Sequence, residues 1–203
     1  MRNSCSHLLQ PSLCLAIFCL LFADEAIAEP SEWEIDQEHF SIFFEVNHID
    51  FQSQLGFFLE ASGSFTYHAD TQELTSGRVE IQADSIFTNN KDRDDHLRGR
   101  DFLSARRNPI IGFEATSYLP VNENEEHATL HGNLTMLGQT HPIILTVVVN
   151  KKERYPFGHR LETLGISAST TILRSQWGMD YGVANNMVGD EVKLRFEFEA
   201  LRK

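Results

Sequence analysis

The segment EVKLRFEFEA, residues 191–200, alternates charged and apolar residues over its whole length. Its apolar positions are Val192, Leu194, Phe196, Phe198 and Ala200. A period of two is typical of a β-strand with one buried face and one face in contact with water. The segment therefore predicts a strand whose apolar face must be covered by another part of the chain.

The same alternation recurs, less regularly, in seven earlier segments. They are residues 40–48, 63–67, 79–83, 111–115, 128–134, 143–149 and 164–168. Turn-forming stretches such as residues 68–77 and 120–126 separate neighbouring segments. Together with residues 191–200, the pattern predicts eight antiparallel strands.

One stretch, residues 90–103, has the pattern of a helix. Asn89 or Asn90 can cap its first turn, and three aspartates near that end favour a helix N-terminus. Pro109 follows soon after the predicted end. With one helix and many strands, the expected fold class is mainly β.

The apolar faces of these strands can be covered by a second sheet or by closure of one sheet into a barrel. An eight-stranded barrel has an interior wide enough to be filled by side chains or to hold one small ligand. Phenylalanine is frequent, with 15 copies in the chain. Its rings would suit an apolar ligand in a barrel and would equally fill the core of a sandwich. The pattern alone leaves both architectures open.

The charge balance bears on the class of partner. The 203 residues are 41% hydrophobic and 23% charged, which is a globular composition. Lysine plus arginine number 17 against 29 for aspartate plus glutamate, a net charge of −12. Such an acidic surface repels the phosphates of nucleic acid, so we expect no nucleic-acid partner.

The first 28 residues have the features of a secretory signal peptide. Arg2 precedes an apolar run over residues 13–22, shorter than the about 20 residues of a membrane span. Ala26 and Ala28 supply the small residues of a cleavage site. We expect a signal peptide at 1–28, one domain at 29–203, and a periplasmic or secreted location.

All three cysteines lie inside this leader, at Cys5, Cys14 and Cys19. The exported chain would therefore have no thiol for a disulfide, a thiolate metal site or a cysteine nucleophile.

Several motifs are spread over nearly the whole mature chain. They are Trp33-Glu-Ile-Asp36 with His39, Phe44-Glu-Val-Asn-His48, Gly56-Phe-Phe58, Arg93-Asp-Asp-His-Leu-Arg98 with Asp101-Phe-Leu103, Asn108-Pro109, Ile111-Gly-Phe113, Gly132-Asn-Leu-Thr135 with Gly138, and Arg174 with Trp177 and Gly178. Together these motifs resemble the YceI-like lipid-binding family. Two departures are Gly99-Arg100, where a small or serine-like residue is usual, and Trp177, where phenylalanine is common.

The resemblance implies an extended, lipocalin-like eight-stranded antiparallel β-barrel with one short helix and an apolar lumen. It thereby favours the barrel over the sandwich. It also implies an exported bacterial protein that binds a polyisoprenoid or similar amphiphile. The bulkier indole of Trp177 would then shorten or reshape the tunnel.

On this basis we expect a binding protein without a cofactor, not an enzyme. It would hold a polyisoprenoid, quinone-like or other long-chain amphiphilic lipid for transport, storage or sequestration. Two alternatives are an enzyme that acts on an isoprenoid lipid and a stress-related interaction protein with a filled barrel. The sequence contains no G-x-S-x-G elbow, no H-E-x-x-H and no glycine-rich phosphate loop. Transient contact with a membrane and a homodimer are left open.

Two groups of residues are candidates for the site. The expected lumen lining is Phe44, Val46, Phe65, Phe113, Leu145 and Phe196, from the predicted strands, together with Trp177 from the resemblance. Cations and hydrogen-bond donors that could contact a lipid head group are His48, Arg93, Arg98 and Arg174.

The helical stretch also contains metal-ligand types, in Asp92, Asp94, Asp95 and His96. Near neighbours on a helix point in different directions, and the spacing matches neither an EF-hand loop nor a zinc motif. We therefore expect these carboxylates to cap the helix and to pair with nearby arginines, and we expect no metal site.

Cleavage of the leader can be checked directly. Because Ala26 and Ala28 place the cleavage site after residue 28, amino-terminal sequencing of the exported protein should begin at Glu29. Exported protein that begins at Met1 would contradict this prediction.

Overall fold

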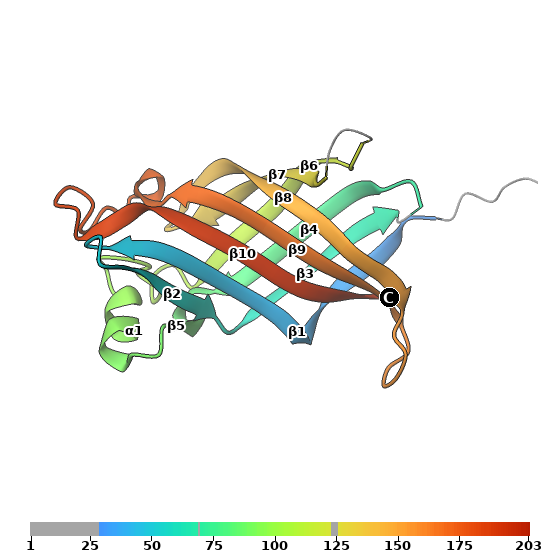
Figure 1. Cartoon of the computed structure of the whole chain (residues 1–203), viewed down its shortest axis with the longest axis horizontal. Coiled ribbons are helices and arrows are strands. Elements are labelled where there is room, and N and C mark those ends of the chain that lie inside the picture. Colours follow the sequence, from blue (N-terminus) through green and yellow to red (C-terminus); the bar gives the residue numbers. More distant parts are fainter. Residues whose placement is uncertain (1–28, 69, 123–125) are drawn as a thin grey trace, which may run out of the picture.

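The computed structural model describes residues 29–68, 70–122 and 126–203. The expected signal peptide, residues 1–28, lies outside the described residues. Ten strands, one α-helix and two 3₁₀ turns form the described part (Figure 1). Their bounds are β1 Ser31–His48, β2 Gln52–Phe58, β3 Ala61–His68, β4 Glu73–Gln82, η1 Ala83–Ser85, β5 Ile86–Phe87, α1 Lys91–Leu97, β6 Ile110–Leu119, β7 Ala128–Met136, β8 Gln139–Arg154, β9 Glu162–Leu173, η2 Arg174–Trp177 and β10 Val188–Arg202.

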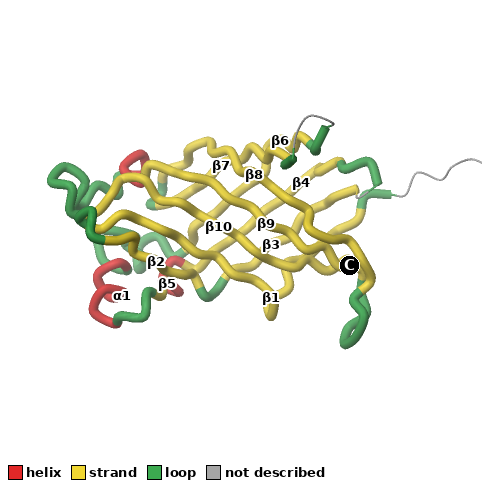
Figure 2. The backbone as a smooth tube through the Cα atoms, viewed as in Figure 1, coloured by secondary structure: helices red, strands yellow, loops and turns green. Residues whose placement is uncertain are grey.

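Eight of the strands form a closed antiparallel ring. The order around it is β1, β10, β9, β8, β7, β6, β4 and β3, and β3 pairs with β1 again. The eight predicted segments fall in these eight strands, and the prediction of an eight-stranded antiparallel barrel is confirmed. Closure gives each apolar face a cover without a second sheet. Figure 2 shows the strands crossing as the wall of one elongated barrel, with α1 at one end.

The two remaining strands extend this wall toward α1. β1 pairs with β3 through its first residues and with β2 through residues 42–48. β5 in turn pairs with β2. The sequence pattern missed β2 because its inward positions include Gly56 while Leu55 and Phe57 point outward. Its alternation therefore does not separate apolar from polar residues.

β1 is interrupted by a large bulge. Ile35 pairs with Ala200 and Phe40 pairs with Phe198, so residues 36–39 lie opposite Glu199 alone. Bulges of this kind bend a strand and increase its twist. The bend lets β1 pair with β3 before the bulge and with β2 after it.

The helix is shorter than predicted. It ends at Leu97, whereas the pattern predicted a helix to Leu103. The following turn replaces the last helical hydrogen bonds, because the Leu103 amide donates to the Leu97 carbonyl and the Ala105 amide to the Arg98 carbonyl. Capping by Asn90 is confirmed, since its side-chain oxygen accepts from the Arg93 amide at 3.0 Å. No helix in the described ranges is long and apolar enough to cross a membrane.

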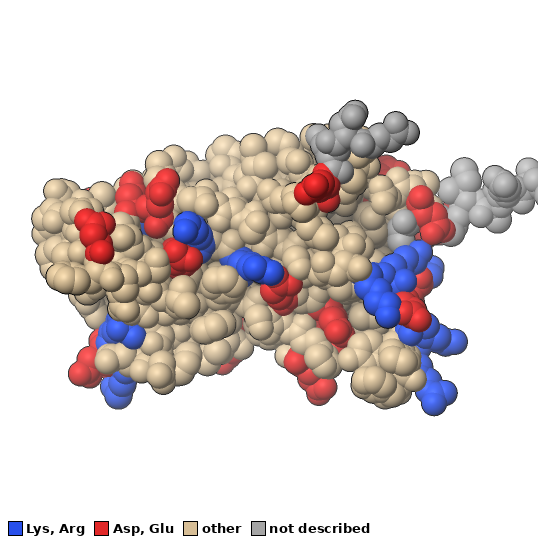
Figure 3. Space-filling view, in the orientation of Figure 1, with Lys and Arg blue, Asp and Glu red and all other residues tan. Residues whose placement is uncertain are grey.

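Charged side chains are scattered over the face in Figure 3, with basic ones gathered at the end that carries the C-terminus. At this end Lys152 and Arg202 both contact Glu162, and Lys203 pairs with Glu34. These lysine and arginine side chains are therefore matched by carboxylates.

Large rings lie over glycines inside the wall. A β-carbon built on Gly132 would lie 2.2 Å from Cζ of Phe113, and one built on Gly56 would lie 2.3 Å from Cζ of Phe44. Real β-carbons do not approach other atoms this closely. The two glycines therefore provide the space that the two phenylalanine rings occupy.

Gly132→Ala should accordingly destabilise the barrel by about 1–3 kcal/mol, because a β-carbon there would displace the ring of Phe113 and would also lie 2.7 Å from the backbone oxygen of Glu114. Urea unfolding measures this free energy. Gly112→Ala is the matched control, since a β-carbon at Gly112 meets nothing within 4 Å. Equal stability of both variants would show that the ring moves without cost.

Candidate functional site

The lumen of the barrel holds two adjoining cavities. One, of about 140 Å³, lies toward the end that carries the C-terminus, and we call it the distal cavity. The other, of about 320 Å³, lies beside α1, and we call it the helix-side cavity. Both are lined by Ile42, Ile81, Ile111, Leu134, Leu194 and Phe196. The two cavities therefore meet within one lumen.

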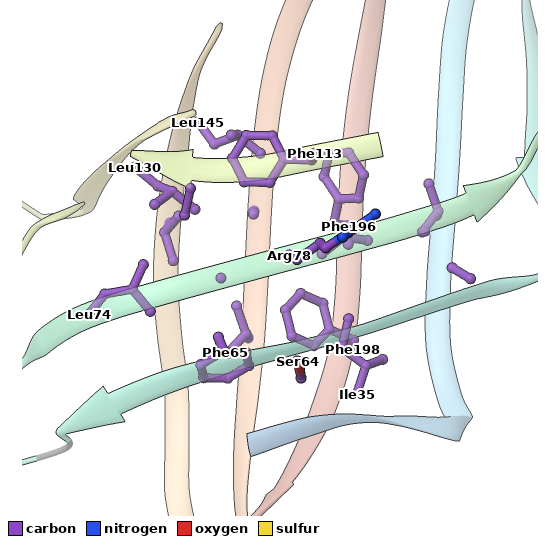
Figure 4. A pocket seen from close by; sticks show the side chains of 18 of the residues that line it. Ile35, Ser64, Phe65, Leu74, Arg78, Phe113, Leu130, Leu145, Phe196 and Phe198 are labelled. Atoms are coloured by element: carbon purple, nitrogen blue, oxygen red, sulfur yellow. The ribbon is translucent and has the colours of Figure 1, made fainter. Parts of the chain in front are cut away.

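The distal cavity is lined almost entirely by apolar side chains. Figure 4 shows Phe65, Phe113 and Phe196 pointing into the same space from β3, β6 and β10. Tyr67 and Tyr118 lie against its outer part, with ring centroids 6.1 Å apart. Burial, together with the neighbouring Tyr118, raises the pKa of Tyr67 to about 12. Both hydroxyls therefore stay neutral at physiological pH.

The helix-side cavity combines an apolar floor with polar groups. Its apolar side includes Phe44, Val46 and Met136. Its polar lining consists of His48, Gln54, Arg93, His96, Arg174 and Tyr181. Such a mixture is typical of a site that buries an apolar body and orients one polar end.

The predicted lumen residues divide between the two cavities. Phe65, Phe113 and Leu145 line the distal one, Phe44 and Val46 line the helix-side one, and Phe196 lines both.

Trp177 does not line either cavity, contrary to the prediction. It is fully buried, donates from Nε1 to the Leu134 carbonyl at 3.1 Å, and packs edge-on against His141. η2 holds the indole against β7 and β8. The indole therefore does not shorten the tunnel, contrary to the expectation.

Arg174 borders the helix-side cavity, but its guanidinium serves the fold. It is 2% exposed and donates to the carbonyls of Gly189, Met179, Tyr181 and Val188 at 2.7–2.9 Å. Burial lowers the pKa of Arg174, against the opposing effect of two nearby aspartates. Four of its five N–H groups are thus committed to backbone, and the structure does not support a head-group role.

The two arginines of the helical region differ in position. Arg98 is not among the lining residues, because it donates to the carbonyls of Asp84 and Ile86 at the back of α1 and pairs with Asp95. Arg93 does line the helix-side cavity. Its Nε and Nη2 donate to the hydroxyl and carbonyl of Thr88, which leaves Nη1 without a partner among the described residues. Arg93 therefore keeps donor capacity toward the lumen, and Arg98 does not.

His96 is a lining residue that the sequence argument did not select. Its Nε2 lies 3.0 Å from Oδ2 of Asp101, and its ring packs on Phe102 and Tyr181. The sequence signal that could have identified His96 is its position in the motif Arg93-Asp-Asp-His-Leu-Arg98. From the sequence alone, His96 is indicated only as a metal-ligand type.

The comparison with family models is decisive for classification. The model described as a YceI-like domain matches residues 33–200. This chain belongs to the YceI-like family.

Relatives and solved structures agree with this assignment. A UPF0312 protein of Pseudomonas paraeruginosa is 32% identical over 194 residues, covering 93% of this chain and 96% of the relative. A YceI protein of Campylobacter jejuni has 25% identity and a TM-score of 0.69, covering 77% of this chain and 90% of that one. A polyisoprenoid binding domain from Saccharophagus degradans shares the fold, with a TM-score of 0.60 at 11% identity, covering 84% of this chain and 98% of that domain.

One group of metal-ligand types in this YceI-like chain lies outside the lumen. Ligand atoms of Asp36, His39 and Glu199 are all within 4.8 Å of one another, at the bulge of β1. His39 is hydrogen-bonded to Asp36 at 2.8 Å, which raises the pKa of the imidazole. Burial acts to raise the pKa of Asp36, but hydrogen bonds from the Glu38 amide and His39 bring it below its ordinary value. The geometry is that of an ion pair closing the bulge.

Two helix carboxylates of the family motif are engaged by neighbouring groups, whereas the N-cap of the helix is Asn90 and not an aspartate as expected. Buried Asp94 accepts from the amide and hydroxyl of Thr88, and Asp95 pairs with Lys91 and Arg98. The expected pairing of a helix aspartate with a neighbouring arginine is confirmed for Asp95.

Arg174→Lys should destabilise this YceI-like protein by at least about 3 kcal/mol. A lysine cannot reach four carbonyls, and each lost charged hydrogen bond is worth about 1.5–3 kcal/mol. Chemical unfolding provides the measurement. Arg78→Lys, at an exposed arginine paired with Glu80, should change stability by less than about 0.5 kcal/mol. If both substitutions had the same small effect, Arg174 would not stabilise the segment whose carbonyls it contacts, residues 179–189.

Proposed function

We propose that this protein binds a long-chain amphiphile of the polyisoprenoid class in its lumen. The observation that carries the proposal is the pair of adjoining apolar cavities inside a closed barrel. The likeness to a polyisoprenoid binding domain adds support. Membership of the YceI-like family agrees with it.

The energetics favour such a ligand. Burial of about twenty carbons at roughly 0.8 kcal/mol per methylene gives a gross gain near 16 kcal/mol. Association costs about 4–15 kcal/mol. Micromolar or tighter binding is therefore attainable without a strong polar contact, which suits the apolar distal cavity.

The polar end of the ligand would lie in the helix-side cavity. Arg93 has an uncommitted Nη1, and His48 and His96 line the same cavity. A phosphate or quinone oxygen there would gain a charge-assisted hydrogen bond worth about 1.5–3 kcal/mol. In the proposed orientation the head group lies near α1 and the chain lies along the barrel.

Binding is favoured over catalysis by the chemistry of the lining. No carboxylate, lysine or cysteine is among the described residues that line the two cavities. His96 with Asp101 is the pair most similar to a general base, and both side chains are about half exposed at the edge of the site. An enzyme acting on an isoprenoid remains the second candidate, favoured only by this pair.

We further propose that the protein is exported and carries its ligand through an aqueous compartment, in the periplasm or outside the cell. The leader expected from the sequence of residues 1–28 supports this location. Brief contact with a membrane would load the lumen. Phe51, which is 88% exposed, and the exposed Ile49 lie in the β1–β2 turn. Asn186 of the loop that carries Tyr181 and Met187, two lining residues, is hydrogen-bonded to Asp50 of this turn.

Filling the lumen should abolish binding. Ala168 on β9 lines the distal cavity, so Ala168→Phe should lower the ligand retained through gentle purification at least tenfold. Native mass spectrometry of the purified protein measures retention, and extraction with organic solvent identifies the retained class.

Ser169→Phe places the same ring on the exposed side of the same strand and should retain ligand normally. Circular dichroism establishes that both variants are folded. Normal retention by folded Ala168→Phe, or the absence of any retained or added prenyl lipid in the unaltered protein, would contradict the proposed function.

A further inference from the structure

All the methionines among the described residues line one cavity. The chain has four methionines, of which Met1 lies outside the described residues. Met136 ends β7, Met179 follows η2 and Met187 directly precedes β10, and all three are lining residues of the helix-side cavity. Three separate segments of the chain therefore bring a thioether to the same site. Such side chains are flexible and polarisable, which suits contact with an apolar ligand.

The three methionines differ sharply in their access to water. Met136 and Met179 are 6% and 7% exposed, whereas Met187 is 41% exposed. Because Met187 both lines the cavity and reaches water, it lies at the mouth of the cavity. Methionine sulfur is oxidised by peroxides to a sulfoxide, and access decides which methionine reacts. An oxidant that arrives from solution therefore meets Met187 first.

The loop that carries Met187 holds its sulfur in place. Asn185 donates from Nδ2 to the Met187 sulfur at 3.1 Å, and its side-chain oxygen accepts from the Met187 amide at 3.3 Å. The same amide donates to the Gly182 carbonyl at 2.9 Å. Asn186 joins the loop to Asp50 of the β1–β2 turn, at the end of the barrel that carries α1 (Figure 1). These contacts fix the Met187 sulfur at the mouth of the cavity.

We propose that Met187 is a reversible oxidation site through which peroxide lowers the affinity of the lumen for its ligand. The inference rests on the proposed function, since the affinity concerned is that for a prenyl lipid. In the reaction the Met187 sulfur attacks one oxygen of hydrogen peroxide, the S–O bond forms as the O–O bond breaks, and the other oxygen leaves as water. The thioether is oxidised by two electrons and the peroxide is reduced. Methionine sulfoxide reductases reverse the change.

The sulfoxide weakens binding in either orientation of its oxygen. If the oxygen faces the cavity, it places a polar group against the apolar part of the ligand, which cannot hydrogen-bond to it. If the oxygen faces water or Asn185, the side chain of Met187 turns out of the lining and its apolar contact with the ligand is lost. A ligand that covers the Met187 sulfur also shields it from peroxide. Oxidation and ligand binding therefore oppose each other.

Shielding is tested with an internal reference methionine. Leu55 is 51% exposed on the outer face of β2 and lines neither cavity, so Leu55→Met adds an accessible thioether outside the lumen. Peptide mass spectrometry follows each sulfoxide during treatment with hydrogen peroxide. Saturating geranylgeraniol should slow oxidation of Met187 at least about fivefold and leave oxidation at position 55 unchanged. Without ligand, Met136 and Met179 should react at least about tenfold more slowly than Met187.

The effect on affinity is measured on the otherwise unaltered protein. After complete oxidation of Met187, the dissociation constant for geranylgeraniol should rise at least about threefold, and treatment with methionine sulfoxide reductases A and B should restore it. Met187→Leu is the matched control, because leucine is apolar, similar in size and has no sulfur. Peroxide should not change the geranylgeraniol affinity of this variant. Circular dichroism establishes that each protein stays folded through the treatment.

An unchanged geranylgeraniol affinity after complete oxidation of Met187 in the folded protein would overturn the inference and leave the proposed function standing. An equal loss of affinity in peroxide-treated Met187→Leu would also overturn it, since the effect would then come from another group. Failure of the untreated protein to bind geranylgeraniol would contradict the proposed function, and the inference with it.

Discussion

Closure of the sheet on itself imposes the main constraint on this molecule. When β10 pairs with β1, every strand of the ring has two neighbours, and every inward side chain faces the same enclosed space. Apolar residues that alternate along eight strands then form one lumen. In the distal cavity small residues, Ala61, Gly77, Ala115 and Ala168, share the lining with phenylalanines and leave space between the rings.

At the helix end the ring is extended by two short strands, β2 and β5, and by α1. β2 continues the line of β3 along β1, and β5 pairs with β2 after β4 has ended. Beyond β5 the chain forms α1 and the turn after it, which Arg98 joins to the carbonyls of Asp84 and Ile86. Three polar residues of the helix-side cavity, Gln54, Arg93 and His96, come from this irregular end, and Arg174 and Tyr181 come from η2 and the loop after it. The regular part of the barrel thus supplies apolar volume, and the irregular end supplies chemical groups.

Alternation was sufficient to predict the eight strands of the ring, because inward and outward positions such as those of β10 differ in polarity, whereas closure into a barrel was predicted only from the family resemblance. It could not predict β2, where Gly56 faces inward and Phe57 outward. The family resemblance indicated Arg174 and Trp177 as candidate site residues. It could not indicate where their side chains point. Arg174 binds carbonyls that are 5–15 positions away in the sequence, a relationship that only the folded loop creates.

The pairing of β1 with β10 also bears on how the molecule folds. These are the first and last strands of the described residues, and Trp33 pairs with Arg202. Closing the ring therefore brings together two segments from nearly opposite ends of the domain. Contacts this distant in sequence must overcome the entropy of closing a very long loop, and folds rich in them form slowly. During synthesis the ring cannot close until the last strand has left the ribosome. Until then the inward phenylalanines and two open strand edges stay exposed, a period in which aggregation competes with folding.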